Sequence, residues 1–512
     1  MAYITDIGIA IAGSVDSGKS TFVGVMTDNI LDNGNGSART SVAKHPHEQA
    51  SGKTSDISSK MFISEENNRA ITLIDLCGHE KYFKTTAYGI TGHYPDYAIM
   101  VISANRGILP MSRQHFTILL STNIPIIILV TRPDITPEGH YNQTLKSSEK
   151  YCQTQLKIPA EFINSYYNDV HRTDSYQASR LDLLSSTFGL TISNKQAIVP
   201  VITISNKTGY YVDFVKKFVN ILKPRKIWEN FNQSLMPSKS IPSESPSKSI
   251  PSESPSESPS ESVPSESVLE SVLDSCTNRI IKNFIHHMDK KIFCKYSQPM
   301  MDAFYIDGLY NPPGIGLVVT GIHRGNNLSI GDTVYIGPFN KEFKEVRIRS
   351  LHNYAKQKIT TLEDHHRGTL ALTSPDKTFL TKEFIRKGMI ILQNKSIIAT
   401  NLCYRFKAAI TIFNHSATLK TNYAPMLQIG NIRQSARMTI DPAENNERDY
   451  ISTREYAYVG FKFKMHPEII EPYQIFVFRS GCVHGVGVIL ELLPISMDSD
   501  ANPDPLKNRL IR

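Results

Sequence analysis

The sequence predicts an α/β domain followed by two antiparallel β-barrels, with a low-complexity insert between them. Three observations lead to this fold class. Apolar runs of strand type recur through the first 228 residues, and each ends in a polar or glycine-containing loop. A repeat of serine, proline and glutamate then interrupts the chain, and short β-rich runs follow it. The expected divisions are an α/β domain at 1–228, an insert at 229–298, barrels at 299–396 and 397–495, and a tail at 496–512.

A glycine-rich loop lies between the first predicted strand and the first predicted helix. Alternating isoleucines from Ile4 to Ile11 indicate the strand, and the helix starts at Ser20. The spacing G-x-x-x-x-G-K-[ST] lets backbone N–H groups point at an anion, while the helix N-terminus adds partial positive charge. Lys19 would reach the outer phosphates of a nucleoside triphosphate, and the Ser20 hydroxyl would bind Mg²⁺. The nucleotide-binding residues predicted here are Gly13, Ser14, Val15, Asp16, Ser17, Gly18, Lys19, Ser20 and Thr21.

A second strand, one strand after this loop, ends in the pattern Asp-x-x-Gly-His at Asp75, Gly78 and His79. An Asp at such a strand end can hold Mg²⁺ through water, and the Gly N–H can face the γ-phosphate. His79 would then lie beside the terminal phosphate. The polar stretch around Thr54 has no periodicity, as expected of a mobile switch, and its hydroxyl and carbonyl would close over Mg²⁺.

Two later strand ends carry the residues expected to read the base. Apolar runs at 125–130 and 198–204 predict these strands. A carboxylate at Asp134 can accept two hydrogen bonds from guanine, whereas adenine cannot donate that pair. Arg132 can stack its guanidinium on the base. The residues assigned to the base are Thr131, Arg132, Asp134, Ser205, Asn206 and Lys207.

Residues 237–274 form the low-complexity part of the insert. The unit PSKSIPSES occurs twice from residue 237 and then shortens to PSES units. Such a segment has too few apolar side chains to offset the entropy of ordering, so we expect it to be disordered. Its seven carboxylates and two lysines give it a charge of −5, which leaves +13 for the rest of the chain.

The β-rich part of the chain carries short strands and turns. Strands are predicted at 303–306, 316–321 and 332–337, and turns at 326–327 and 331–332. Short strands separated by such turns are typical of small barrels. Residues 399–494 have the same character, and we expect a second barrel there.

The motifs together resemble those of the translational GTPases of the elongation factor Tu and elongation factor 1-alpha class. They occur in the expected order at residues 13–20, 54, 75–79, 131–134 and 205–207. Residues 31–34, 47–48, 51–55, 78–82, 85–86 and 89–93 are similar, more narrowly, to the eukaryotic GTP-binding protein 1 and 2 group. The resemblance covers roughly residues 3–228 and 299–495.

This resemblance implies a P-loop GTPase domain followed by two antiparallel β-barrel domains, with GTP and Mg²⁺ as ligands. His79 would position the attacking water, and Lys19 would stabilise charge that develops on the γ-phosphate. The residues in catalytic roles are His79, Lys19 and Thr54, and the metal ligands are Ser20, Thr54 and Asp75. The implied partners are GTP and GDP, and the ribosome or an RNA, either tRNA or mRNA-linked.

Three residues depart from the family pattern. Lys53 precedes the switch threonine, where better-known elongation factors have an apolar residue that helps hold the histidine away. Arg132 and Pro133 differ from the commonest guanine loop. Two alternatives therefore stay open. One is a nucleotide-dependent binding module that hydrolyses GTP negligibly, and the other is an ATP-using enzyme, against which Asp134 argues.

Composition agrees with a cytoplasmic protein that contacts RNA. The chain has 512 residues, a formal charge of +8 and six cysteines without C-x-x-C spacing, which disfavours a disulfide framework and a zinc site. No apolar run approaches the roughly 20 residues of a membrane span, and there is no signal-peptide pattern. We expect a monomer, with neither DNA nor a membrane among its partners.

Overall fold

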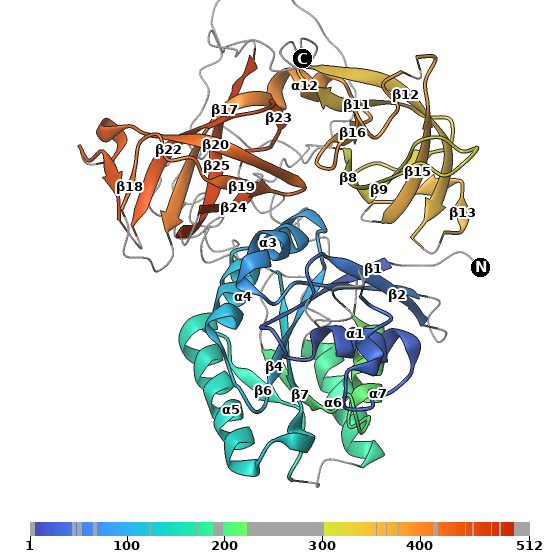
Figure 1. The fold of residues 1–512 in the computed structure, drawn as a ribbon, viewed down its shortest axis with the longest axis vertical. Coiled ribbons are helices and arrows are strands. Elements are labelled where there is room, and N and C mark those ends of the chain that lie inside the picture. Colours follow the sequence, from blue (N-terminus) through green and yellow to red (C-terminus); the bar gives the residue numbers. More distant parts are fainter. Residues whose placement is uncertain are drawn as a thin grey trace, which may run out of the picture.

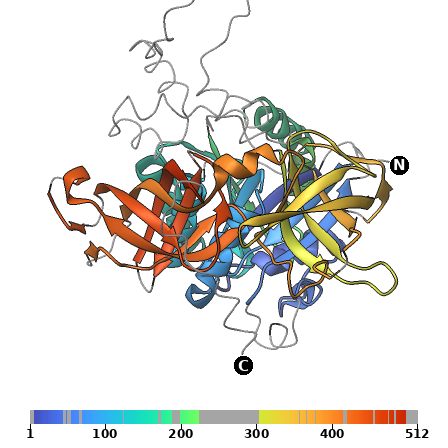
Figure 2. The ribbon, with the colours of Figure 1, turned by 90° about the horizontal axis from the view of Figure 1, so that it is seen from above.

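The computed structural model consists of an N-terminal α/β domain and two β-barrels that lie side by side against it (Figures 1 and 2). It describes residues 6–43, 48, 54–64, 69–122, 124–168, 173–187, 198–222 and 302–495, with breaks at 355, 365, 377, 413–417, 446, 453–454, 473 and 481–482. The Ser/Pro/Glu repeat at 237–274 and Lys53, both discussed above, lie outside the described residues. Within the described part, no helix is both long and apolar enough to span a membrane.

The α/β domain is built on a seven-stranded sheet with the order β2-β3-β1-β4-β5-β7-β6. All neighbouring strands run parallel except β2, which pairs antiparallel with β3 at the edge. The strands are β1 Asp6–Gly13, β2 Ser58–Ser64, β3 Arg69–Asp75, β4 Tyr97–Ser103, β5 Ile126–Thr131, β6 Ala160–Phe162 and β7 Val199–Ile204. Because parallel strands share one carboxyl edge, Gly13, Asp75 and Thr131 all reach the same edge of the sheet.

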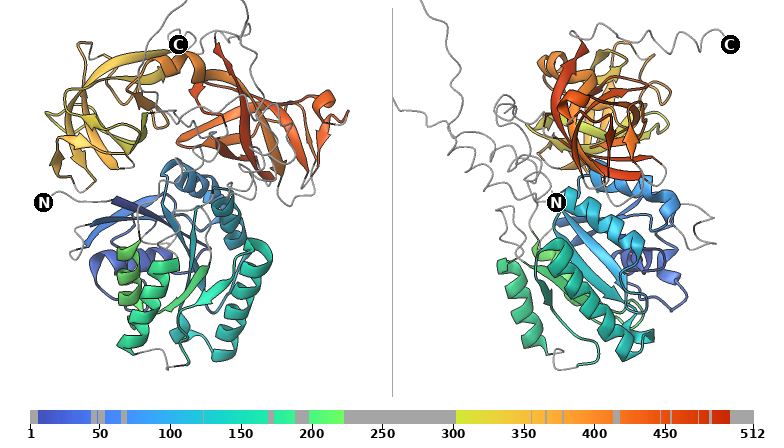
Figure 3. Two further views of the ribbon diagram at one scale, coloured as in Figure 1. Left: turned by 180° about the vertical axis from the view of Figure 1, so that it is seen from behind. Right: turned by 90° about the vertical axis from the view of Figure 1, so that its left-hand side faces the viewer.

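Helices cover both faces of this sheet (Figure 3). They are α1 Lys19–Asp28, α3 Phe83–Gly92, α4 Pro110–Ser121, α5 Glu138–Tyr151, α6 Asp174–Thr187 and α7 Val212–Ile221. Ile9 of β1 belongs to the core that α1, α6 and α7 cover, and Ala10 belongs to the core under α3, α4 and α5. Strand β1 is therefore buried on both sides, which explains its nearly continuous apolar sequence.

The first barrel is a closed ring of six antiparallel strands, because β11 pairs with both β16 and β12. Its strands are β8 Ala303–Tyr310, β9 Val318–Arg324, β11 Thr333–Phe339, β12 Glu342–Asn353, β15 Arg367–Thr373 and β16 Ile390–Leu392. Strand β13 Lys358–Ile359 extends the ring, and β10 Leu328–Ser329 pairs with β14 Thr361–Leu362. Closure leaves no unpaired edge in this ring.

Helix α12 (Ser396–Asn401) leads into the second barrel, which closes where β17 pairs with β22. Its six strands are β17 Leu402–Ile412, β19 Met426–Ile429, β20 Ile432–Ile440, β22 Tyr456–Phe463, β24 Ile475–Ser480 and β25 Val483–Pro494. Strand β23 Glu468–Ile469 joins β17, and β18 Leu419–Lys420 pairs with β21 Tyr450–Ile451. We call this unit barrel III and the preceding one barrel II.

Barrel III contacts α3 and barrel II contacts the residue that follows it, on the side of the α/β domain that faces the barrels (Figures 1 and 3). From barrel III, Gln428 Nε2 donates to the Lys84 carbonyl at 2.7 Å, and Arg479 lies over the Phe83 ring at 5.0 Å. From barrel II, the guanidinium of the buried Arg367 donates to the carbonyl of His93, directly after the helix. A movement of this segment would therefore change contacts of both barrels.

The predicted order of an α/β domain followed by two antiparallel barrels is confirmed. One detail of the sequence interpretation was wrong. Asp75 ends the second strand after the glycine-rich loop and not the first, because β2 forms between them. Strand β2 has a mixed sequence with half-buried side chains, and it is held by pairing with β3 along its whole length. Strands β4 and β6 were also not among the predicted strands.

Candidate functional site

The glycine-rich loop leaves β1 at Gly13 and enters α1 through Gly18. Gly13 has a φ of 144° and Gly18 a φ of 89°, a region that residues with a Cβ rarely adopt. A Cβ on Gly13 would stand 2.3 Å from the Val101 carbonyl oxygen, so β4 also excludes a larger residue. The Thr131 hydroxyl donates to the Ser17 carbonyl at 2.7 Å and ties the loop to the end of β5.

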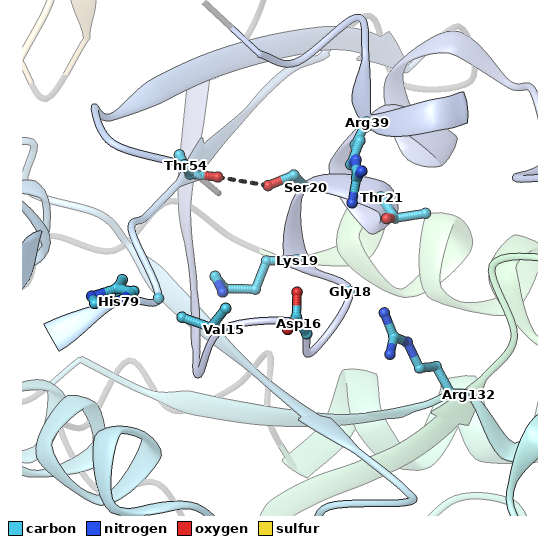
Figure 4. A pocket seen from close by; sticks show the side chains of 11 residues that line it. Val15, Asp16, Gly18, Lys19, Ser20, Thr21, Arg39, Thr54, His79 and Arg132 are labelled. Atoms are coloured by element: carbon cyan, nitrogen blue, oxygen red, sulfur yellow. Dashed lines mark hydrogen bonds between the residues drawn. The ribbon is translucent and has the colours of Figure 1, made fainter. Parts of the chain in front are cut away.

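The Lys19 side chain extends across the glycine-rich loop. Its Nζ donates to the Ser14 carbonyl at 2.7 Å, and only 6% of the residue is exposed. Burial lowers the pKa of Lys19, and the Asp75 carboxylate opposes this effect. Gly78 packs so closely that a Cβ there would stand 2.5 Å from Nζ. The ammonium is therefore held where the loop and the Asp-x-x-Gly-His segment meet (Figure 4).

Three oxygen-bearing side chains converge beside Lys19. The Ser20 hydroxyl donates to Asp75 Oδ2 at 2.6 Å and lies 3.0 Å from the Thr54 hydroxyl (Figure 4). The other oxygen of Asp75 is buried and has no hydrogen-bond partner among the described residues. Burial raises the pKa of Asp75 to about 6, although the nearby Lys19 opposes the shift. Two hydroxyls and a carboxylate are the hard oxygen ligands that suit Mg²⁺, so the donor set fits this ion.

The chain that carries Thr54 is held by Glu48. This buried carboxylate accepts hydrogen bonds from the backbone N–H of Ser55 at 2.6 Å and from the Ser55 hydroxyl at 2.8 Å. Thr54 itself is half-buried, and its hydroxyl lies 3.0 Å from the Ser20 hydroxyl at the end of the loop. The chain on the C-terminal side of Thr54 is therefore held in place by Glu48.

His79 follows Gly78 and is half-buried at the edge of the same pocket (Figure 4). Its Nδ1 accepts a hydrogen bond from the backbone N–H of Lys81 at 3.1 Å, which caps the short helix Glu80–Tyr82. The ring also meets Tyr82 edge-on, with centroids 6.2 Å apart. The structure therefore engages Nδ1 of His79 in the cap of this helix.

The residues assigned to the base lie at the ends of β5 and β7. Asp134 accepts a hydrogen bond from the Ser205 hydroxyl at 2.7 Å, which orients the carboxylate. Arg132 has a left-handed backbone with a φ of 60°, and its side chain lines the pocket (Figure 4). The carbonyl of Asn206 accepts from the Asp32 N–H at 2.9 Å, and the Lys207 side chain lies against Gly34. The 31–34 loop therefore supports the base-reading loops.

The structure brings most of the predicted residues around one pocket. Its lining residues are Val15, Asp16, Gly18, Lys19, Ser20, Thr21, Arg39, Thr54, Gly78, His79 and Arg132. The predicted residues outside this lining are Gly13, Ser14, Ser17, Asp75, Thr131, Asp134, Ser205, Asn206 and Lys207. Asp75 lies behind Ser20, and Asp134 and Ser205 form the adjoining base end.

Arg39 is the pocket residue that sequence reasoning missed. It ends a short helix at Ser37–Arg39 that packs on α1, where Gly24 leaves room for the Ala38 carbonyl. The Arg39 guanidinium lies over Gly36 and points into the pocket near Thr21 (Figure 4). No motif marks an arginine whose position depends on packing between α1 and a separate loop. Its positive charge suits an anionic ligand in this pocket.

The fold and this pocket define a P-loop nucleotide-binding protein that carries two β-barrels. The model of the elongation factor Tu GTP-binding domain matches residues 6–278, which is more than half of the chain. The chain belongs to this family and is an elongation-factor-like member of the translational GTPases.

The chain is 28% identical over 98% of its length to GTP-binding protein 1 of Xenopus laevis and 27% identical over 96% to GTP-binding protein 2 of Mus musculus. It spans 65% and 70% of the lengths of these two relatives. Its fold is similar to that of elongation factor SelB from Methanococcus maripaludis, solved with the GTP analogue GppNHp. That similarity has a TM-score of 0.54 at 18% identity and covers 98% of this chain and 82% of SelB.

Proposed function

We propose that this protein binds GTP with Mg²⁺ and hydrolyses it to GDP and phosphate as part of a cycle of RNA or ribosome binding. The observation that carries the proposal is the convergence of Lys19, Ser20, Thr54 and His79 on one pocket at the carboxyl edge of a parallel sheet. These residues come from separate segments of the chain. Chance alone rarely assembles a phosphate loop, two hydroxyls and a histidine in this way.

In this proposal each residue has one task. The loop amides and Lys19 bind the β- and γ-phosphates and stabilise the charge that develops on them. Ser20, Thr54 and Asp75 would hold Mg²⁺, which supplies positive charge at the phosphate oxygens when bound. His79 orients the attacking water for in-line displacement. Asp134, held by Ser205, selects guanine.

The partner is proposed from the family and from charge. Relatives named as translation elongation factors and a remainder charge of +13 outside residues 237–274 favour RNA or the ribosome, with tRNA and mRNA-linked complexes as the classes to test. We propose a monomer that acts in the cytoplasm.

The experiment is single-turnover hydrolysis of GTP by the full chain, with and without ribosomes, combined with an affinity measurement. His79→Ala should slow hydrolysis by roughly 10²–10⁴ while GTP affinity stays within a few-fold, because the ring addresses water and not the nucleotide. His140→Ala, which removes an exposed histidine of α5, is the matched control. If the parent binds GTP but releases no phosphate under either condition, the protein is a binding module, and the proposed hydrolysis is wrong.

A further inference from the structure

A second, open cleft adjoins the nucleotide pocket. Val15, Gly78 and His79 line both of them. Arg106, which has no role in the proposed function, lines the second cleft from the turn that follows β4. Its guanidinium Nη1 lies 3.7 Å from Oδ2 of Asp16, and Asp16 belongs to the lining of the nucleotide pocket. An ion pair therefore joins the second cleft to the glycine-rich loop.

The backbone around Arg106 is held firmly at the carboxyl edge of the sheet. The Arg106 N–H donates to the Ser103 carbonyl at 3.1 Å, which closes the turn after β4. Within this turn, the Ala104 N–H donates to the Thr131 carbonyl at 2.8 Å, and the Ala104 carbonyl accepts from the Thr144 hydroxyl at 2.7 Å. Because β4 pairs with β1, the turn lies beside the loop that leaves β1. The fold therefore fixes the base of the arginine side chain next to this loop.

The backbone of Asp16 has a left-handed conformation, with a φ of 59°. The Ser17 N–H donates to the Ser14 carbonyl at 3.4 Å and closes a turn with Val15 and Asp16 at its centre. A left-handed residue within such a loop lets successive N–H groups face one anion. Aspartate and asparagine tolerate this conformation better than other residues with a Cβ. Since asparagine would serve the backbone equally well, the negative charge of Asp16 has a separate explanation.

The charge of Asp16 is unfavourable in a pocket that binds phosphates. Its side chain lies beside Lys19 (Figure 4). Burial lowers the pKa of Lys19, and Asp75 and Asp16 are among the charges that oppose this effect. The Asp16 carboxylate is therefore close enough to act on the phosphate-binding ammonium, and at that range it would also repel the phosphates of a nucleotide. A cation that neutralises Asp16 would remove this repulsion.

Arg106 is suited to supply that cation. A guanidinium keeps its proton at every pH at which proteins are folded, so the charge persists when a nucleotide binds. The side chains of Arg106 and Asp16 are 49% and 46% exposed. Ion pairs with this exposure contribute little to the stability of a fold. We therefore expect the pair to act on the charge of the glycine-rich loop and not on the stability of the domain.

We propose that Arg106 is a positioning residue of the phosphate site, which acts through Asp16. Its guanidinium neutralises the carboxylate and holds the turn at Val15 and Asp16 in the conformation that presents N–H groups to the phosphates. This inference rests on the proposed function, which makes GTP the ligand of the pocket. Because GTP carries more negative charge than GDP, neutralisation of Asp16 favours GTP more strongly. Arg106 thereby helps to set the preference for the triphosphate.

The test is a double-mutant cycle on the full chain, with the affinities for fluorescent GTP and GDP analogues measured by titration in the presence of Mg²⁺. The cycle consists of Arg106→Gln, Asp16→Asn and the two combined. Arg106→Lys keeps the positive charge. Arg113→Gln removes an exposed arginine of α4 and is the matched control, so any general effect of net charge appears in it as well. Thermal unfolding of each variant reports whether the fold is intact.

Arg106→Gln should weaken GTP binding by about five- to ten-fold and GDP binding less, because the Asp16 carboxylate then stands uncompensated beside the phosphates. The double variant should bind GTP within about two-fold of Asp16→Asn alone, since the arginine has no charge left to neutralise. Arg106→Lys should stay within about three-fold of the parent. The loss in Arg106→Gln should shrink in 1 M salt, where the Debye length is about 3 Å. Thermal midpoints should match that of the control.

Equal GTP affinity of Arg106→Gln and Arg113→Gln would overturn the inference. So would a loss that persists undiminished in the double variant, because Arg106 would then act independently of Asp16. A lowered thermal midpoint with equal losses for GTP and GDP would show a structural role and would also overturn it. A parent that binds GTP but releases no phosphate would contradict the proposed hydrolysis, whereas the affinities of the cycle would still decide the role of Arg106.

Discussion

At the scale of single residues, His115 is a fully buried titratable group beside the glycine-rich loop. It lies on α4 with no exposed surface, and its Nδ1 accepts the Gly13 N–H at 3.1 Å. The ring stacks on Phe83 with centroids 6.0 Å apart. Burial lowers the pKa of His115 to about 3, and the charge of Lys19 adds to the effect. The imidazole therefore stays neutral and supports the start of the glycine-rich loop.

This pKa predicts how stability depends on pH. Below the ordinary His pKa of 6.5 the unfolded chain takes up a proton that folded His115 does not, so its contribution falls as pH decreases toward about 3. His115→Gln keeps an acceptor for Gly13 and should remove about 1.4 kcal/mol per pH unit from the slope of unfolding free energy between about pH 6 and pH 4. Urea unfolding at each pH measures this slope. His140→Gln should keep the parental slope, and an unchanged slope in His115→Gln would contradict the prediction.

Asp134 carries the expected selectivity for guanine. Its carboxylate matches two donors that guanine presents. The Ser205 hydroxyl donates a hydrogen bond to Asp134 Oδ1 at 2.7 Å. In Asp134→Asn an amide donor faces a donor of the base, and a mismatched buried group costs about 1–3 kcal/mol. GTP affinity should fall and xanthosine triphosphate affinity should rise in a competition assay. Asp182→Asn, at an exposed site on α6, is the control, and unchanged selectivity in Asp134→Asn would reject the assignment.

At the scale of elements, the contact between α1 and the helix Ser37–Arg39 depends on Gly24. A Cβ at this position would stand 1.8 Å from the Ala38 carbonyl oxygen, which is backbone and cannot rotate away. The carboxylate of Asp32 accepts the N–H groups of Gly34 and Ala38 and so shapes the loop that leads to this contact. The position of Arg39 in the pocket follows from this packing.

Gly24→Ala should therefore destabilise the protein by about 1–3 kcal/mol and weaken GTP binding, because Ala38 and Arg39 must move. Gly139→Ala is the matched control on α5, where a Cβ would meet nothing within 4 Å. That change should stabilise the protein by about 0.5–1 kcal/mol through helix propensity. Thermal unfolding and GTP titration measure both effects. Parental stability in Gly24→Ala would show that the helix Ser37–Arg39 can shift freely.

At the scale of the whole molecule, the two barrels and α3 form one connected unit. The Thr91 hydroxyl donates to the Gly430 carbonyl of barrel III at 3.3 Å, and His93 lies 3.6 Å from Asp307 of barrel II. Because only the short helix Glu80–Tyr82 separates α3 from Gly78 and His79, a change at this end of the pocket has a short path to both barrels. In the proposed function, this path would couple the nucleotide state to the RNA partner.

The Ser/Pro/Glu repeat at 237–274 is predicted to be dispensable for this unit. Deletion of residues 237–274 with a short flexible connection should preserve the thermal midpoint and the rate of GTP hydrolysis. The closure free energy of a loop changes by only about 0.6 kcal/mol per doubling of length. Differential scanning fluorimetry and single-turnover hydrolysis measure the two properties. A deleted protein that unfolds or loses nucleotide binding would show that the repeat is structural.

The sequence by itself determined the order of the domains and most of the nucleotide pocket. Gly13, Asp75 and Thr131 end separate apolar runs, and parallel strands bring such ends to one edge whatever the details of packing. The spacing of Lys19 and Ser20 within one loop is likewise local. These predictions needed only periodicity and short-range geometry.

Only the tertiary structure decided the rest, because the remaining features depend on contacts between distant segments. Strand β2 exists through its pairing with β3, and Arg39 reaches the pocket because Gly24 admits the Ala38 carbonyl. Strand register across the closed ring of barrel III places Arg405 opposite Lys462, and Lys462 opposite Arg437. Residues more than 20 positions apart become neighbours there. Their spacing along the chain does not predict which of them pair.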